Sequence, residues 1–560
     1  MDYKDLADCI YPDAKDIKYY EDMYPARNLP EGAEVVRIGP SPTGFVHVGT
    51  IFQALLNQTI ARQSNGVFYV RIEDTDQNRK IENGATDIIN SLKNFDLEYD
   101  EGMISEEDGK GDYGPYKQSQ RLEIYHAYAK SLIAKGRAYP CFATQEEVEE
   151  IRAKQEAAGL ITGFYGIWAK YRELPVDEAI ARIKNGDEYV IRLRSHGRED
   201  RKIRVKDCIK GKLEFPENYM DAVLIKKDGF PVYHFAHAVD DHLMHTTTVV
   251  RGEEWMPSLP LHIELFQAFE MEPPKYAHTP NMLKDDNGKK RKISKRKDPE
   301  AAVSFYSTEG IPSLSLKEYL MNIINSSFEG WRRANPDKPM SEFKMELGKM
   351  NASGAIFDTI KLLDVSKNVI ARLNSQEIYD AVYAWSETYD EELHKLLEDK
   401  DYSLKVLGIE RENSNKPRKD ISKWSEVKDN IIYMYQRPTE YDFDKISGED
   451  MKKVVKAYLD VYSPDDDKDT WFNKMKDVAE SQGYAREVKE FKANPDKWPG
   501  HVGDVSTVIR VATTGRRNTP DLYEILKVLG ERVNAHLDER LMTFQCMDPV
   551  SLKHESTSCL

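Results

Sequence analysis

Two short apolar segments, joined through a glycine- and proline-rich loop and a helix, constrain the fold more than any other feature. Glu34–Ile38 (EVVRI) and Val67–Ile72 (VFYVRI) have the β-branched and aromatic composition of buried strands. Between them GPSPTGFVHVG leads into a helical pattern, and a second helix is predicted over Ile81–Phe95. This order is a βαβ unit, which places both strands in one parallel sheet. Ligands of such sheets bind beyond the carboxyl ends of the strands, where the loop and Glu73–Asp76 (EDTD) fall.

The remaining patterns divide the chain into several segments, as expected for 560 residues, which exceed the size of one core. Mixed helices and short strands between 115 and 225 are typical of an insertion, and strand patterns resume after it. The predicted segments are an N-terminal extension (1–32), two halves of a nucleotide-binding domain (33–114 and 226–300), an inserted α/β domain (115–225), a helical segment (301–375) and a helical C-terminal region (376–560).

Charge and composition exclude several classes of protein. With 80 Lys+Arg and 96 Asp+Glu, the formal charge of −16 argues against a protein that coats nucleic acid without sequence preference. No segment approaches the roughly 18 apolar residues of a membrane span, and the acidic N-terminus lacks the apolar core of a signal peptide. The five cysteines form no CxxC pair, so we expect a reduced, cytoplasmic protein without a disulfide framework.

Two motifs are suited to binding phosphate. His47-Val48-Gly49-Thr50 stands at a predicted helix start, where free N–H groups and the helix dipole favour an anion. Alone this motif is weak, because His501-Val502-Gly503 repeats it, and we interpret the repeat as a helix-start turn. Lys284–Lys297 carries eight basic residues against two acidic ones and would alone be interpreted as a solvated loop. Within it, the lysines of KISKR on a flexible loop could neutralise charge as pyrophosphate leaves.

A further group of polar residues lies at or near predicted strand ends: Arg37, Glu73, Tyr233, His237 and Arg251. Two arginines in one pocket suit a substrate with two carboxylates, and Glu73 could hold an ammonium group. Taken singly, a surface ion pair explains Arg251 or Glu73 better. Which arginine meets which carboxylate stays open.

In this order and spacing, RIGPSPTGFVHVGT, YVRIEDTD, YHFAHAVDDHLM, VVRGEEW and KISKR resemble the bacterial glutamyl-tRNA synthetases, a family of class I aminoacyl-tRNA synthetases. HVGT and KISKR match the family's two ATP signature motifs. The resemblance is dense over 34–330 and weaker to the end of the chain. It implies a Rossmann-type α/β catalytic domain with an inserted α/β acceptor-end-binding domain, a helical stem-contact domain and an all-α anticodon-binding region.

The resemblance also implies the reaction, a glutamate–tRNA ligation in translation. The α-carboxylate of L-glutamate attacks the α-phosphorus of ATP and releases pyrophosphate, and the 2′-OH of the 3′-terminal adenosine of tRNA(Glu) then takes the glutamyl group. Because no protein nucleophile is needed, catalysis rests on positioning and electrostatics. Mg²⁺ is expected with ATP, held mainly through phosphates and water. The implied protein is a monomer without a membrane partner.

Matching positions carry the implied roles. The catalytic residues are His47, Lys292 and Lys295. The ATP-binding residues are Pro42, Thr43, His47, Gly49, Thr50, Glu254, Trp255, Lys292, Ile293, Ser294, Lys295 and Arg296. The glutamate-binding residues are Arg37, Gly39, Ser41, Glu73, Tyr233, His237 and Arg251. The candidates for tRNA contact are Arg411, Arg418, Arg516 and Arg517, for each of which a charged loop between helices is an equal alternative.

Two departures from the family and two alternatives remain. His237 stands where the family more usually has Asn, and the insertion holds one unpartnered cysteine, Cys141, so no zinc site is expected. A glutaminyl-tRNA synthetase would bind the anticodon with β-barrels, whereas the residues after 375 have helical patterns. A catalytically inactive tRNA-binding protein is disfavoured by the intact His47, Lys292 and Lys295. Discrimination against tRNA(Gln) stays open.

Overall fold

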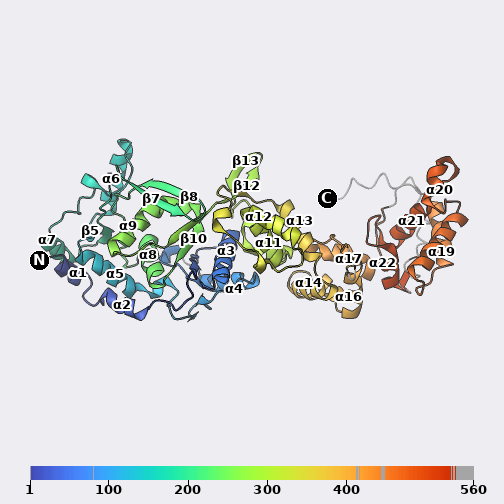
Figure 1. The fold of residues 1–560 in the computed structure, drawn as a ribbon, viewed down its shortest axis with the longest axis horizontal. Helices are drawn as coiled ribbons and strands as arrows, with labels where there is room; N and C mark the ends of the chain where they lie inside the picture. Colours follow the sequence, from blue (N-terminus) through green and yellow to red (C-terminus); the bar gives the residue numbers. More distant parts are fainter. Residues whose placement is uncertain are drawn as a thin grey trace. The chain divides into compact units, whose positions relative to one another are not determined.

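The computed structural model describes residues 2–79, 81–294, 296–411, 414, 416–442, 448–530, 532–533 and 537 (Figure 1). The chain forms two compact units. Unit 1 consists of Met1–Tyr306 and Leu316–Thr359, and unit 2 consists of Ser307–Ser315 and Ile360–Leu560. No helix within the described ranges combines the length and apolarity needed to cross a membrane.

Unit 1 contains the predicted parallel sheet. Strands β1 (Val35–Ile38), β2 (Val67–Val70) and β3 (Glu101–Met103) are parallel neighbours, and β4 (Gly109–Lys110) adds an antiparallel edge. A second parallel pair, β10 (Thr248–Gly252) and β11 (Lys275–Thr279), lies beside β1, where Thr247 N donates to Val35 O over 2.9 Å. All four residues of β1 are buried, which explains why three of them are apolar and only Arg37 is polar.

Helices pack against this sheet, and some of their residues lie at the carboxyl ends of its strands. The first helix after β1 is α3 (Val48–Ser64), whose buried side includes Ile51, Leu55 and Leu56 and contacts β1 and β2. The predicted Ile81–Phe95 helix is α4 (Gly84–Asn94). Later in the chain, α8 (Tyr233–Leu243) precedes β10 and α9 (Leu259–Phe269) follows it, and these two helices pack against each other.

The segment between the two halves of the sheet builds antiparallel structure. Strands β5 (Ala138–Cys141), β6 (Val190–Leu193) and β9 (Val223–Ile225) form one antiparallel sheet, and β7 (Lys202–Asp207) with β8 (Gly211–Pro216) forms a hairpin. The helices here are α5 (Leu122–Ala134), α6 (Gln145–Ala157) and α7 (Val176–Lys184). The N-terminal extension adds α1 (Tyr3–Ile10) and α2 (Ile17–Met23), both packed against α5.

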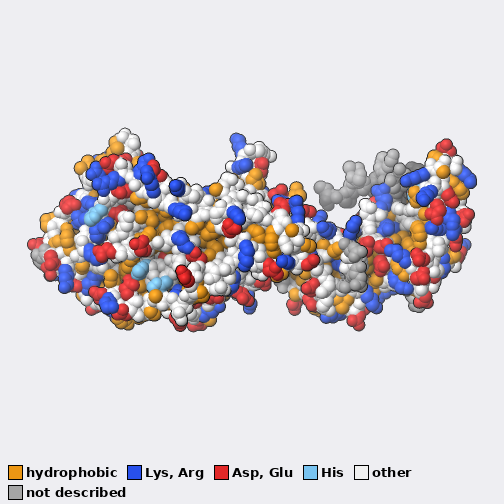
Figure 2. All heavy atoms as spheres, in the orientation of Figure 1, with side chains coloured by type: hydrophobic (Ala, Val, Ile, Leu, Met, Phe, Trp, Pro, Cys, Tyr) orange, Lys and Arg blue, Asp and Glu red, His pale blue; other side chains and the backbone are white. Residues whose placement is uncertain are grey.

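The basic window is a hairpin over most of its described length, not the flexible loop that the sequence pattern favoured. Strands β12 (Met282–Asp286) and β13 (Lys289–Lys292) pair antiparallel, and β14 (Ala355–Ile356) joins β12 in parallel. The connecting Asn287 and Gly288 have φ of 54° and 83°, the left-handed values that an Asn-Gly turn adopts readily. Lys292 therefore ends a strand. Figure 2 shows basic side chains at the tip of this hairpin.

The described residues after Asp298 are mainly helical, as predicted, with β14 as their one short strand. Helices α11 (Ser313–Ile324) and α12 (Ser326–Ala334) follow α10 (Val303–Glu309) along the chain, and a boundary between the units falls within each of α10 and α11. The described part of unit 2 contains no strand, and its helices are α13 (Thr359–Ile370), α14 (Ser375–Tyr389), α15 (Glu391–Leu396), α16 (Lys400–Gly408), α17 (Val427–Tyr435), α18 (Gly448–Leu459), α19 (Lys468–Ser481), α20 (Val488–Ala493), α21 (Val502–Thr514) and α22 (Leu522–Leu529). All of them except α20 contribute to one hydrophobic core, which includes Val382, Val455 and Ile509.

Candidate active site

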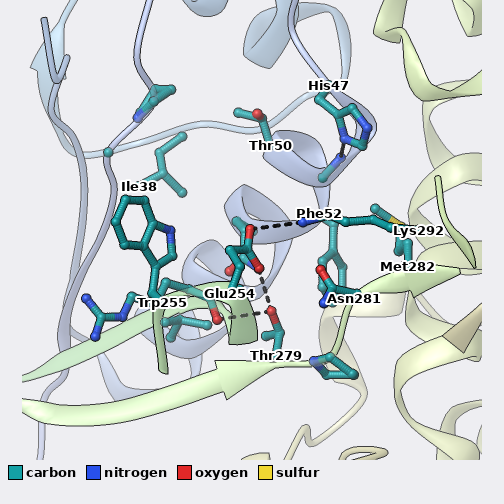
Figure 3. A pocket seen from close by; sticks show the side chains of 18 of the residues that line it. Ile38, His47, Thr50, Phe52, Glu254, Trp255, Thr279, Asn281, Met282 and Lys292 are labelled. Atoms are coloured by element: carbon teal, nitrogen blue, oxygen red, sulfur yellow. Dashed lines mark hydrogen bonds and ion pairs between the residues drawn. The ribbon is translucent and has the colours of Figure 1, made fainter. Parts of the chain in front are cut away.

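A cavity of about 380 Å³ lies at the carboxyl ends of β1 and β10. Its walls come from β1, the loop after it, the start of α3, the 3₁₀ turn Glu253–Ser258 and the β12–β13 hairpin (Figure 3). Twelve predicted residues line it: Arg37, Gly39, His47, Gly49, Thr50, Glu73, Tyr233, Arg251, Glu254, Trp255, Lys292 and Ile293. The parallel topology thus brings together residues that are more than 250 positions apart in sequence.

Several predicted residues lie elsewhere, and several lining residues were not predicted. Ser41, Pro42, Thr43, His237, Ser294 and Arg296 do not line the cavity, and Lys295 lies outside the described residues. The lining also includes Gln53, Thr279, Asn281 and Met282, which no motif indicated. Gln53 donates to Thr279 over 2.6 Å, and Thr279 donates to the carbonyl of Arg251 over 3.1 Å. A glutamine in an otherwise apolar stretch of α3 was the only signal in the sequence.

The two His-Val-Gly motifs have the same local structure. His47 precedes α3, and its Nδ1 accepts from Gly49 N over 2.9 Å; His501 precedes α21, and its Nδ1 accepts from Gly503 N over the same 2.9 Å. Each imidazole therefore caps its helix, and in the neutral ring the proton is on Nε2. The predicted helix-start turn at His501 is confirmed. Only the first copy lines the cavity.

Behind the cavity, one buried carboxylate organises the cationic side chains. Asp241 Oδ1 accepts from Arg71 Nη1 over 2.8 Å, and Asp241 Oδ2 accepts from Arg37 Nη2 over 3.1 Å. Burial opposes ionisation of this carboxyl, but Arg37 and Arg71 hold the pKa of Asp241 well below its usual range. A neighbouring carboxylate, Asp240, accepts from Arg121 Nε over 2.8 Å. This network includes Arg71, Asp240 and Asp241, which stand in the motifs YVRIEDTD and YHFAHAVDDHLM but had no predicted role.

Glu73 turns from this network toward the cavity. Its Oε1 accepts from Arg71 Nη2 over 2.8 Å, and burial raises the pKa of the Glu73 carboxyl in spite of Arg71 and Arg37. Gly39 has a specific reason to be glycine, because a Cβ there would stand 2.2 Å from Glu73 Oε1. The Glu73 carboxylate can therefore bind a cation at this wall of the cavity, and Gly39 leaves room for it because glycine has no side chain.

His237 lies one layer behind the cavity. It is fully buried, and its Nδ1 is 2.7 Å from Asp241 Oδ2 and 3.2 Å from Arg37 Nη2. The shorter contact, to an ionised carboxylate, identifies Nδ1 as the proton donor, so Nε2 faces the Tyr276 hydroxyl at 3.4 Å. His237 thus holds Asp241 and, through it, Arg37. Burial lowers the pKa of His237 to about 4, even though Asp241 opposes the change.

This pKa predicts that His237 weakens the fold in mild acid. The unfolded chain binds a proton near pH 6.5 and the folded chain only near pH 4, so stability falls as the pH drops through that window. From pH 7 to pH 5, one such histidine lowers the unfolding free energy by about 2 kcal/mol. Urea unfolding followed by hydrogen exchange of the β1 and α8 peptides, which reports on unit 1 alone, should show a smaller pH dependence for His237→Asn by this amount. An unchanged pH slope in the variant would contradict the assignment.

The two cavity arginines differ in their partners. Arg37 is paired with Asp241. Arg251 instead donates to two histidines, His278 and His262, and its buried Nη2 has no hydrogen-bond partner within the described part of the chain. At the rim, Lys292 Nζ lies 3.4 Å from Glu254 Oε1, and both side chains are about half exposed (Figure 3). The cavity therefore has the Glu73 carboxylate at one wall and Lys292 at its rim. It also contains the Arg251 guanidinium, for which the described residues supply no carboxylate.

The predicted tRNA contacts all lie in unit 2, but they differ in exposure. Arg411 is 7% exposed and donates to Asp420 Oδ1 over 3.0 Å, and burial together with Arg418 lowers its pKa to about 10. Arg418 and Arg516 line a cavity of about 280 Å³. Arg517 donates to Asp442 over 2.9 Å. Arg411 is thus part of the internal structure, while Arg418 and Arg516 face a hollow.

Comparison with known proteins identifies the family. Residues 34–343 match the model of class I tRNA synthetases (E and Q), catalytic domain. The chain is 49% identical over 540 residues to a glutamate–tRNA ligase of Clostridium perfringens, covering 95% of this chain and 99% of the relative. It is 48% identical over 550 residues to that of Acetivibrio thermocellus, covering 97% and 100%. The chain belongs to the glutamate–tRNA ligases.

A solved structure agrees with this membership. The crystal structure of a glutamate tRNA ligase from Elizabethkingia meningosepticum, in complex with its amino acid, superposes with a TM-score of 0.73 at 25% identity and covers 92% of this chain and all of its own. The resemblance to glutamyl-tRNA synthetases is confirmed, as are the class I catalytic domain and the helical C-terminal part. The glutaminyl alternative loses its support, because the near full-length relatives are glutamate–tRNA ligases.

Proposed function

We propose that this glutamate–tRNA ligase activates L-glutamate with ATP in the cavity at the ends of β1 and β10. The observation that carries the proposal is the presence, in one cavity, of Arg251, for which the described residues supply no carboxylate partner, and of the Glu73 carboxylate. Glutamate is an anion at both ends with one ammonium group between them. The side-chain carboxylate pairs with Arg251, the ammonium group with Glu73, and Arg37 and Tyr233 complete the pocket.

ATP occupies the part of the cavity lined by α3 and the hairpin. The Nε2–H of His47 and the N-terminal amides of α3 donate to phosphate oxygens. The α-carboxylate oxygen attacks the α-phosphorus, the bond to the bridging oxygen breaks, and pyrophosphate leaves with the electron pair. Lys292 exchanges Glu254 for the phosphates and neutralises the departing charge. Lys295, which follows it, shares this role by its place in KISKR.

In the second step a tRNA terminal hydroxyl attacks the glutamyl carbonyl and AMP leaves. The inserted segment 115–225 holds the acceptor end, and the helical unit 2 meets the anticodon through Arg418, Arg516 and Arg517. Mg²⁺ comes with ATP and is held mainly by phosphate oxygens and water. A monomer in the cytoplasm that needs no zinc remains our prediction.

The two His-Val-Gly caps provide a matched test of the ATP assignment. Asparagine is a good N-cap, so His47→Asn and His501→Asn should both keep their helices, while only the first removes the Nε2–H at the cavity. We expect His47→Asn to slow glutamate-dependent ATP–pyrophosphate exchange by about 100-fold. His501→Asn should exchange like the wild type. Equal rates for the two variants, measured with tRNA present, would refute the role of His47.

A further inference from the structure

Arg251 is held by two imidazole rings in place of carboxylates. Strand register sets Arg251 on β10 directly opposite His278 on β11, and Arg251 Nε donates to His278 Nε2 over 3.1 Å. Arg251 Nη1 lies 3.0 Å from Nδ1 of His262 on α9. Because a guanidinium only donates, both imidazole nitrogens accept and carry no proton.

Two further residues fix these tautomers. His278 Nδ1 lies 2.7 Å from Asp207 Oδ2 and therefore carries the proton that Asp207 accepts. His262 Nε2 lies 2.8 Å from His234 Nδ1 and donates to it. His278 and His262 are fully buried, and burial lowers the pKa of both, so the rings are neutral at physiological pH. Each acceptor nitrogen is thus aimed at Arg251 by a second hydrogen bond on the other side of its ring.

The consequence is electrostatic. Arg37 forms an ion pair with Asp241, whereas the described residues provide Arg251 with two neutral hydrogen-bond partners and no carboxylate. A carboxylate in place of either imidazole would orient Arg251 equally well and would also neutralise it, so it would compete with an anionic substrate. Imidazole nitrogens fix the plane of the guanidinium and leave its charge for the ligand. Arg251 lines the cavity, and its buried Nη2 has no hydrogen-bond partner among the described residues.

We propose that His262 and His278 are positioning residues that select a carboxylate side chain, by orienting Arg251 without neutralising it, and so favour glutamate over glutamine. The inference rests on the proposed contact between Arg251 and the glutamate side chain. It assigns to two histidines outside the cavity lining a measurable share of glutamate affinity.

The test compares an acceptor that is deleted with one that is retained. His262→Phe keeps a planar ring and removes the acceptor, whereas His262→Asn places an amide oxygen near the position of Nδ1. In ATP–pyrophosphate exchange with tRNA(Glu), we expect His262→Phe to raise the KM for glutamate by about 10- to 100-fold, with the KM for ATP unchanged. His262→Asn should recover most of this loss. At His278, Phe and Gln form the equivalent pair, because the Gln oxygen reaches the position of Nε2.

The controls separate positioning from structure and from the site assignment. His242 is another histidine of unit 1, with its Nε2 3.0 Å from Glu21 Oε1 and outside the cavity, so His242→Phe should leave the KM for glutamate unchanged. If Phe and Asn at position 262, and Phe and Gln at 278, give the same KM for glutamate, the positioning role is refuted. If Arg251→Gln itself leaves this KM unchanged, the proposed site is refuted and the inference with it.

Discussion

Replacing Arg251 by glutamine is expected to lower kcat/KM for glutamate by about 100- to 1000-fold. The variant keeps two hydrogen-bonding groups but loses the one cavity guanidinium for which the described residues supply no carboxylate. Removing one partner of a buried charged pair costs about 3–4 kcal/mol, which corresponds to that change in rate constant. Steady-state ATP–pyrophosphate exchange with tRNA present, at varied glutamate concentration, measures the effect.

The KM for ATP is the internal control for this variant. Arg251 lies on β10, whereas the proposed phosphate-binding groups lie on α3 and the β12–β13 hairpin, so the affinity for ATP should persist. Arg251→Lys should be intermediate, because an ammonium group keeps the charge but cannot donate to both His262 and His278 in one plane. A variant with unchanged glutamate kinetics, or one that loses ATP and glutamate equally, would contradict the assigned contact.

Replacing Asp241 by asparagine is expected to destabilise unit 1 by about 3–5 kcal/mol. The carboxylate is fully buried and accepts from Arg37, Arg71 and His237, so its neutral analogue leaves two buried guanidinium groups without their common anion. Because the chain has two units, a global unfolding curve would mix their transitions. Hydrogen exchange followed by mass spectrometry resolves the peptides of β1 and α8, whose protection should fall in the variant.

A surface ion pair supplies the matched control for Asp241. Asp22 pairs with Lys18 over 2.8 Å, and both side chains are largely exposed. Asp22→Asn should leave the protection of β1 and α8 unchanged, since exposed pairs contribute little. Equal effects of the two replacements would show that Asp241 does not organise the buried network.

Cavity residues could be predicted from the sequence where they lie at the end of a strand or in the loop that follows it. Arg37, Glu73 and Arg251 all meet at one edge because parallel strands align their carboxyl ends there. The residues that contact these side chains from behind the cavity were not predicted, because their positions depend on strand register and on helix packing. Arg251 faces His278 only through the β10–β11 register, and His262 reaches it from α9.

Two other differences have local physical causes. His237 is i−4 from Asp241 on α8, so the helix turns it toward that carboxylate and away from the cavity lining. The basic window forms a hairpin because Asn287-Gly288 is a turn sequence between two runs that can pair. The Asn-Gly turn is visible in the sequence, whereas the charge pattern of the window alone indicates a solvated loop.

The most direct test of the central claim is attachment of amino acid to tRNA by the wild-type protein. With ATP, tRNA(Glu) and either glutamate or glutamine, the account predicts that glutamate is attached and that glutamine is not. Only glutamate brings a side-chain carboxylate to Arg251, for which the described residues supply none. Attachment of glutamine with comparable kcat/KM, or no attachment of glutamate by folded protein, would contradict it.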